Sequence, residues 1–145
     1  MTLEAADPVA TLSGVTHRYG TILALDDVSL EAPAGRMVGV IGPDGVGKST
    51  LLGLMAGVRR LQTGAVQTLG GAMDDRRHRD AVCGRVAYMP QGLGRNLYPT
   101  LSVFENIDFF GRLYGQSAAE RDDRITDLLH STGLEPFPDR GPGAR

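Results

Sequence analysis

Several residue types that mark particular classes of protein are scarce in this chain of 145 residues. It has one cysteine, Cys83, and no tryptophan. A single cysteine excludes an internal disulfide and a cysteine-rich metal site, so we expect a reduced compartment. No stretch approaches the roughly 20 consecutive apolar residues of a membrane span, and the N-terminus lacks the pattern of a secretory signal. We therefore predict one domain, complete or partial, that is not exported and does not insert into a membrane.

Charge of one sign is not concentrated anywhere along the chain. The net charge is −2 and no long basic run occurs, which argues against a nucleic-acid interface. The densest charged cluster, residues 74–80, alternates in sign and is typical of a solvated helix face. Fourteen of the fifteen basic residues are arginine, and the only lysine is Lys48. This lysine is therefore a candidate for a task that suits a compact ammonium better than a planar guanidinium.

The patterning of the first half predicts strands. Residues 10–19 and 22–31 alternate apolar and polar side chains, and the short gap between them favours antiparallel pairing. Residues 36–41 are nearly all apolar, as in a strand buried on both faces of a parallel sheet. Two more short strands are predicted at residues 65–69 and 85–89.

Helices are predicted after these first strands. Residues 49–58 place leucines at helical spacing, and Gly57 is expected to end that helix. Residues 102–114 and 117–132 are predicted as two more helices, the first opened by a capping box of Ser102 and Glu105. The Pro- and Gly-rich residues 136–145 are expected to form a loop or tail.

The most specific motif is G-x-x-x-x-G-K-[ST], which follows a predicted strand and opens a predicted helix. By composition, a chance match somewhere in the chain has a probability of roughly one in five hundred. Such a loop lets successive backbone N–H groups converge on phosphate oxygens at a helix N-terminus. The residues of the motif are Gly42, Pro43, Asp44, Gly45, Val46, Gly47, Lys48, Ser49 and Thr50.

Individual residues of this loop have separate expected tasks in binding a nucleotide. Lys48 is expected to contact the β- and γ-phosphates, and the Ser49 hydroxyl is the expected ligand of Mg²⁺. Pro43 has no N–H to donate. The Asp44 carboxylate would repel a triphosphate, so we expect its side chain to point away. The motif alone fits ATPases, kinases and GTPases equally well.

Residues on both sides of the loop narrow this choice. The stretch 15–20, ending in Tyr19-Gly20, and the stretches 24–30 and 33–36 resemble the opening of ATP-binding-cassette (ABC) ATPases. The resemblance implies that Tyr19 stacks on adenine, for which a flat aromatic face is suited. On this basis, replacement of Tyr19 by phenylalanine is expected to be nearly neutral. Downstream, residues 86–91 are similar to the glutamine loop of the family, which implies that Gln91 contacts Mg²⁺ and the attacking water.

The following segment resembles the start of the family's helical subdomain. The segment from Asn96 to Asn106 is the part that the resemblance implies would face a transmembrane partner. Residues 109–115 are close to the drug-export and ribosome-associated subgroup. Three later features of the family are missing: the signature motif, the Walker B strand and the switch histidine. The histidines present, His17, His78 and His130, are expected at the surface.

The resemblance predicts an α/β P-loop fold of the ABC type. Its expected parts are an antiparallel β start, a mainly parallel core sheet and the beginning of a helical subdomain, incomplete at the C-terminus. We predict a strand-rich core at residues 1–91, the start of the helical subdomain at 92–135 and a tail at 136–145. The fragment is expected to bind Mg²⁺ and ATP without hydrolysing ATP by itself.

The implied parent protein is the ATP-binding subunit of a transporter, with export as the expected direction. It would pair with a second ABC ATPase domain and lie in the cytoplasm, peripherally at the inner face of the cell membrane. Two alternatives stay open: a soluble, ribosome-associated ABC ATPase, and a nucleotide-binding fragment without activity. The reading frame beyond Arg145 would separate them, because a signature motif and transmembrane helices would favour the transporter.

Overall fold

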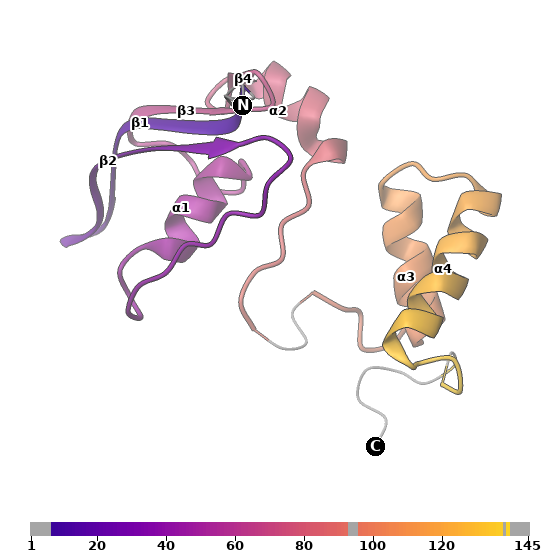
Figure 1. Ribbon diagram of the computed structural model, residues 1–145. Helices are drawn as coiled ribbons and strands as arrows, with labels where there is room; N and C mark the ends of the chain where they lie inside the picture. Colours follow the sequence, from indigo (N-terminus) through magenta and orange to yellow (C-terminus); the bar gives the residue numbers. More distant parts are fainter. Residues whose placement is uncertain (1–6, 93–95, 138, 140–145) are drawn as a thin grey trace, which may run out of the picture. The chain divides into compact units, whose positions relative to one another are not determined.

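The computed structural model describes residues 7–92, 96–137 and 139. Contacts between residues divide the chain into two units, Met1–Tyr88 and Met89–Arg145. The first unit contains a sheet and the helices α1 and α2, and the second contains α3 and α4 (Figure 1). The phosphate-loop motif and Tyr19 therefore belong to the first unit, and Gln91 belongs to the second.

The sheet of the first unit begins with a long hairpin. Strands β1 (Pro8–Tyr19) and β2 (Ile22–Pro33) are antiparallel, which confirms the predicted pairing. Strand β3 (Thr63–Thr68) lies on the other edge of β1, and the short β4 (Gly71–Ala72) pairs with β3, both antiparallel. The order across the sheet is β2-β1-β3-β4.

A β-bulge in β1 decides which of its side chains face the core. Leu12 pairs with Leu30 but Val15 pairs with Val28, so β1 carries one extra residue between these pairs. The extra residue moves the inward set from even to odd positions, and Leu12 and Val15 are both buried. His17 follows Val15 on the inner face and is only 6% exposed. The prediction that His17 lies at the surface is therefore wrong, because strict alternation does not allow for the bulge.

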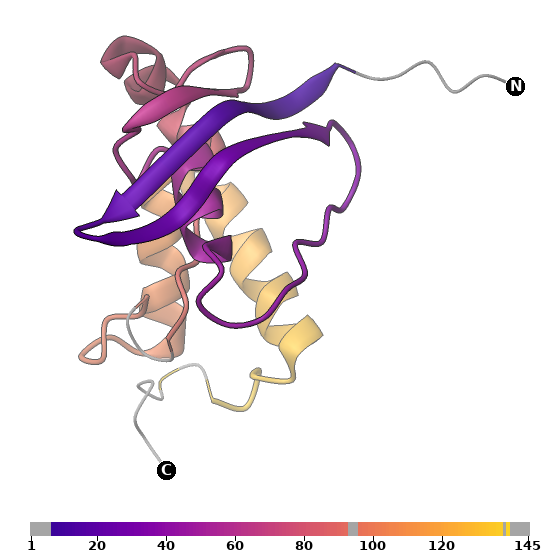
Figure 2. The same ribbon diagram turned by 90° about the vertical axis from the view of Figure 1, so that its left-hand side faces the viewer.

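Helix α1 (Lys48–Met55) lies behind the β1–β2 hairpin in Figure 2 and supplies the other side of the core. It ends close to the predicted point, with Ala56 as its C-cap and Gly57 at a φ of 73°. Its buried leucines pack with apolar residues of the sheet and of the following segment. The core cluster consists of Leu12, Val15, Leu25, Leu51, Leu54, Val66, Met73 and Val82.

The charged cluster at residues 74–80 forms helix α2 (Arg76–Val82), which is followed by the 3-10 turn η1 (Cys83–Arg85). Two of its side chains are only partly exposed and turn back to β3 and to Met73, the residue after β4. His78 Nε2 lies 2.8 Å from the Thr68 carbonyl oxygen, and Arg79 Nη1 donates to the Met73 carbonyl at 2.6 Å. The expected surface position of His78 is therefore only partly correct.

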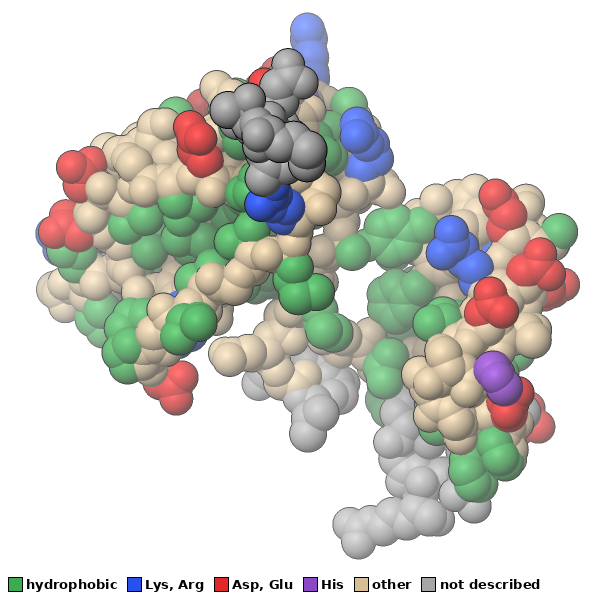
Figure 3. Space-filling model, in the orientation of Figure 1, with side chains coloured by type: hydrophobic (Ala, Val, Ile, Leu, Met, Phe, Trp, Pro, Cys, Tyr) green, Lys and Arg blue, Asp and Glu red, His purple; other side chains and the backbone are tan. Residues whose placement is uncertain are grey.

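The predicted strands at residues 36–41 and 85–89 are not present. Residues 37–43 and 86–90 have no regular secondary structure, and the sheet of the described residues is antiparallel throughout. Met37, Ile41 and Met89 are 101%, 97% and 86% exposed, and apolar side chains cover much of the face of the first unit seen in Figure 3. An apolar run indicates burial, but a strand also needs neighbouring strands, and the described residues supply none here.

The second unit contains helices α3 (Val103–Leu113) and α4 (Ala118–Thr132). The predicted capping box is confirmed: Glu105 N–H donates to Ser102 Oγ at 3.2 Å, and Ser102 N–H donates to Glu105 Oε2 at 2.7 Å. Helix α4 has the same arrangement with Ser117 and Glu120, which was not predicted from the sequence. In both helices, side chains therefore accept from the N–H of the N-cap residue and from the N–H of the third helical residue.

One carboxylate ties the two helices together. Asp108 of α3 accepts from Arg121 Nε of α4 and from Arg112 Nε of its own helix, both at 2.6 Å. The hydrogen bond from Arg121, and next that from Arg112, hold the pKa of Asp108 below its usual value. The pKa values of Glu105 and Glu120 are also lowered, by their bonds with Ser102 and Ser117.

We expect the helices of the second unit to become less stable in acid. A carboxyl whose pKa is lower in the folded state stabilises the fold above its unfolded pKa, and this contribution is lost as pH falls through the folded value, here below about pH 4. Urea titrations followed by circular dichroism at several pH values measure it. Asp108→Asn should make the dependence shallower, with the remainder due to Glu105 and Glu120. An unchanged pH profile in this variant would contradict the assigned role.

Candidate nucleotide-binding site

The phosphate-loop motif leads directly into the N-terminus of α1, and this terminus is left open. The N-cap is Gly47, no side chain caps the helix, and its first turn contains no acidic residue. Side chains of Asp75, Ser102 and Ser117 cap α2, α3 and α4. The first N–H groups of a helix have no partner within it, and the helix dipole there favours a negative charge. The start of α1 therefore fits a phosphate group.

Gly47 allows the loop to lie directly against β2. Its φ is 94°, and a Cβ there would overlap the Ala24 carbonyl oxygen and approach Leu25 Cδ2 to 2.9 Å. Gly45 also has a positive φ, 82°, but a Cβ on it would meet nothing within 4 Å. The two positions thus require glycine for different reasons. Gly45 is required for the turn alone, whereas Gly47 is required both for the turn and for the close approach of the loop to the sheet.

The ammonium of Lys48 lies over the turn of the loop. Its Nζ donates to the carbonyls of Gly42 at 2.7 Å and Pro43 at 2.6 Å. It also lies 3.9 Å from Asp44 Oδ1, although the Asp44 side chain is fully exposed. Such an exposed pair contributes little to stability. A triphosphate approaching Lys48 would nevertheless have to displace this carboxylate.

The remaining residues of the motif differ in exposure. Val46 is 48% exposed and Ser49 is exposed in the first turn of α1, whereas Thr50 is buried. No group of three or more His, Cys, Asp or Glu side chains that could hold a metal ion occurs within residues 7–92, 96–137 and 139. The exposed Ser49 hydroxyl fits a Mg²⁺ ion that takes its other oxygens from phosphates and water.

Tyr19 lies at the end of β1 and is linked to the phosphate loop. Its hydroxyl is 3.1 Å from Thr50 Oγ1, the residue is 41% exposed, and its ring and that of His17 meet edge to face with their centres 4.9 Å apart. The guanidinium carbon of Arg59 lies 5.4 Å from the centre of the same ring. Neither the bond to Thr50 nor the contact with Arg59 is predictable from the sequence, because no local pattern connects Tyr19 with residues 31 and 40 positions away.

Gln91, the predicted Mg²⁺ and water contact, is exposed and belongs to the second unit. Close to it in the sequence, Asn96 Nδ2 donates to the Pro90 carbonyl at 3.3 Å. The role of Gln91 stays a prediction.

The segment from Asn96 to Asn106 contains a structural anchor. Asn106 is 3% exposed, and its Nδ2 lies within hydrogen-bonding distance of the carbonyls of Tyr98, Leu101 and Ser102. Its Oδ1 accepts from Tyr98 N–H at 2.8 Å. The buried Asn106 side chain therefore shapes this segment and is not available to a partner. The exposed large side chains are Leu97, Tyr98 and Phe104.

Comparison with known proteins decides what kind of chain carries this loop. Residues 25–145 match the family model described as ABC transporter. The chain belongs to this family. It is 34% identical over 134 residues to the sn-glycerol-3-phosphate import ATP-binding protein UgpC 1 of Rhizobium johnstonii, covering 92% of this chain and 35% of that protein. It is also 34% identical over 128 residues to the Nod factor export ATP-binding protein I of Ralstonia nicotianae, covering 88% and 39%.

Solved structures agree with this membership in the ABC family. An ATP-binding subunit of an ABC transporter superposes with a TM-score of 0.80 at 27% identity, over 94% of this chain and 55% of that one. A dimeric ATP-binding cassette in a post-hydrolysis state, bound to ADP and phosphate, gives 0.72 at 25% identity, over 92% and 61%. The predicted fold class, an α/β P-loop fold of the ABC type, is confirmed for the part of that fold that the chain spans, but the described residues do not form the mainly parallel core sheet that was expected with it.

The ABC chain spans about a third of the length of the curated relatives that it matches. Those relatives include both import and export ATP-binding proteins, so membership does not fix a direction of transport. Among the helices of the described residues, none has the length and apolar character needed to cross a membrane.

Proposed function

We propose that residues 42–50 bind Mg²⁺ and ATP, with the base stacked on Tyr19. The observation that carries this proposal is the open N-terminus of α1 beside the ammonium of Lys48. Backbone N–H groups and a cation from one short loop suit a chain of phosphates. Tyr19 supports the same assignment, because its hydroxyl contacts the last residue of that loop, Thr50.

Each residue would act on a different part of the ligand. Lys48 would exchange its contacts with the loop carbonyls for the β- and γ-phosphates, while the N–H groups at the start of α1 hold phosphate oxygens. Ser49 would provide one oxygen to Mg²⁺, and the ion would neutralise phosphate charge when bound. Gln91 is proposed to orient water and contact the ion through its neutral amide. All of these groups bind and position, and none forms a covalent bond.

We propose that the protein to which this chain belongs powers transport in partnership with a second ATPase domain and a transmembrane subunit. Relatives are named as ATP-binding proteins of import and export systems, and one similar cassette is dimeric. Export is proposed only on the resemblance of residues 109–115 to drug-export proteins. A peripheral position at the cytoplasmic face of the membrane follows from the same proposal.

The proposed contact with the transmembrane subunit lies in the segment from Asn96 to Asn106. Its exposed apolar side chains Leu97, Tyr98 and Phe104 are the candidates. Tyr98→Asp should weaken co-purification with that subunit and leave ATP affinity unchanged. A ribosome-associated ATPase would use the same surface for a different partner, and co-sedimentation with ribosomes tests that alternative.

Tyr19→Ala should weaken the binding of ATP and of ADP by similar factors, about fivefold. The binding of inorganic triphosphate should be unaffected, because stacking acts on the base alone. Titration of the full chain with each ligand measures this. The bond to Thr50 holds the ring of Tyr19 in place, so Tyr19→Phe, which loses this bond, should now cost a measurable part of the ATP affinity and again spare triphosphate. If triphosphate affinity falls as far as ATP affinity in Tyr19→Ala, the ring supports the loop and is not the base site.

A further inference from the structure

The loop that follows α1 is fixed to the tip of β1. Gln62 forms two hydrogen bonds with the backbone of Arg18: its Oε1 accepts from Arg18 N–H at 2.8 Å, and its Nε2 donates to the Arg18 carbonyl at 2.9 Å. At the other end of the loop, the N–H groups of Val58 and Arg59 both donate to the Gly53 carbonyl, at 3.0 and 3.1 Å. The backbone that carries Arg59 is therefore held from both sides, beside Tyr19.

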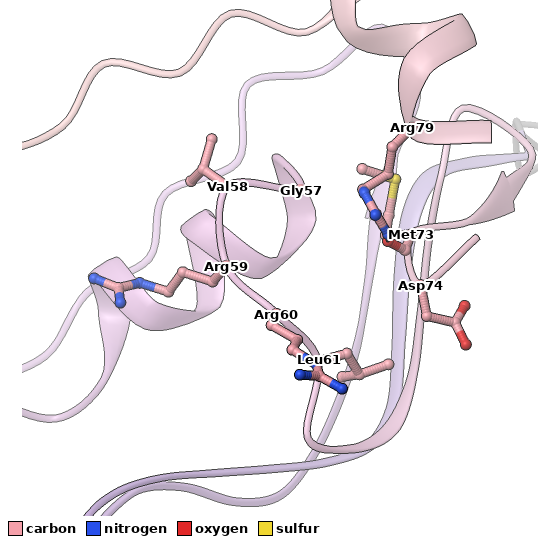
Figure 4. Close-up of a pocket in the computed structure, with 8 residues that line it drawn as sticks. All are labelled: Gly57, Val58, Arg59, Arg60, Leu61, Met73, Asp74 and Arg79. Atoms are coloured by element: carbon pink, nitrogen blue, oxygen red, sulfur yellow. The ribbon is translucent and has the colours of Figure 1, made fainter. Parts of the chain in front are cut away.

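The stem of Arg59 lies against α1 at a point where the helix has no side chain. A Cβ on Gly53 would stand 3.0 Å from Arg59 Cγ and Cδ and 3.1 Å from Nε. The loop lines one side of a pocket, and Met73, Asp74 and Arg79 line the other side. Figure 4 shows the Arg59 side chain extending away from these three residues. Glycine at position 53 thus leaves the space through which this arginine passes along the helix.

The guanidinium of Arg59 lies over the ring of Tyr19. The distance of 5.4 Å from its guanidinium carbon to the ring centre is within the range of a cation–π contact. The same ring is held at its hydroxyl by Thr50 and meets the edge of His17. One face of Tyr19 is therefore occupied by a cation that its own chain supplies, and 41% of the residue is still exposed.

We propose that Arg59 is a positioning residue for the base of the nucleotide, which acts by fixing the ring of Tyr19. This inference rests on the proposed function of Tyr19 and the phosphate loop. A ring that is already held in place loses less freedom when a base stacks on it, so more of the stacking energy appears as affinity. The cation on one face leaves the exposed part of the ring for the base. Arg59 thereby favours ligands that carry a base over those that carry phosphates alone.

The test compares ATP with inorganic triphosphate on the full chain and on three variants. Arg59→Met keeps a long stem and removes the guanidinium. Arg60→Met is the matched control, because it removes the same charge from the next position of the loop. We expect Arg59→Met to bind ATP about two- to fivefold more weakly than Arg60→Met does, with equal triphosphate affinities. Arg59→Lys should recover most of the loss, because an ammonium also attracts an aromatic face.

Each other outcome overturns the proposal in an identifiable way. Equal ATP affinities in Arg59→Met and Arg60→Met would mean that Arg59 affects ATP binding only through its charge and not through its contact with Tyr19. A parallel loss of triphosphate affinity in Arg59→Met would place Arg59 on the phosphates, and tighter ATP binding would mean that it competes with the base. If the unmodified chain binds triphosphate and ATP equally, Tyr19 is not a base site. If it binds neither, the proposed function itself fails.

Discussion

Lys48→Ala should lower the affinity of the chain for ATP by about a hundredfold or more. Lys48 is the only lysine of the chain, and its ammonium already lies within the turn of the phosphate loop, on the carbonyls of Gly42 and Pro43. The two charge-assisted contacts proposed between Lys48 and the phosphates, together worth roughly 3 kcal/mol, would disappear with it. Titration with a fluorescent ATP analogue measures the change.

The matched control for this variant is Arg60→Ala, which removes an exposed charge of the same sign outside the loop. It should bind ATP nearly as well as the unmodified chain, since screening weakens distant surface charges. Equal affinities for Lys48→Ala and the unmodified chain would refute the assignment of residues 42–50.

Gly47→Ala should reduce the free energy of unfolding of the first unit by about 3 kcal/mol or more. The backbone there has a φ of 94°, and the new methyl group would overlap the Ala24 carbonyl of β2. The conformation alone costs an alanine about 1–2 kcal/mol, and relief of the overlap requires the loop to move off the sheet. Urea unfolding followed by circular dichroism gives the value.

Gly45→Ala separates the cost of the backbone conformation from the cost of the overlap, because Gly45 has a similar φ of 82° but open space around an added Cβ. It should cost about 1–2 kcal/mol. If both variants lose the same stability, the contact between the loop and Ala24 is not important, and the loop is positioned in some other way.

The features that the sequence predicted correctly are encoded by neighbouring residues. The β1–β2 hairpin follows from alternation and a two-residue turn, and the start of α3 follows from Ser102 and Glu105 three positions apart. The phosphate loop combines a fixed spacing with a helix start. The family assignment followed from these local patterns and was confirmed by the match over residues 25–145.

The features that the sequence did not predict depend on residues far apart in the chain. Residues 36–41 are apolar enough for a buried strand, but a strand forms only when another strand pairs with it. His17 is buried because of a bulge opposite β2, which alternation alone does not indicate. Arg59 reaches Tyr19 only because Gly53 leaves room on α1. In each case the missing information is tertiary.

The central claim, that residues 42–50 bind Mg²⁺ and ATP, is tested most directly by amide hydrogen exchange. With ligand at about a hundred times its dissociation constant, exchange of the loop amides from Gly45 to Thr50 should slow by up to about a hundredfold. The same addition to Lys48→Ala should leave these amides almost unchanged. Protection by Mg²⁺ and ATP that spares residues 42–50 and falls elsewhere, or that persists in Lys48→Ala, would contradict the account.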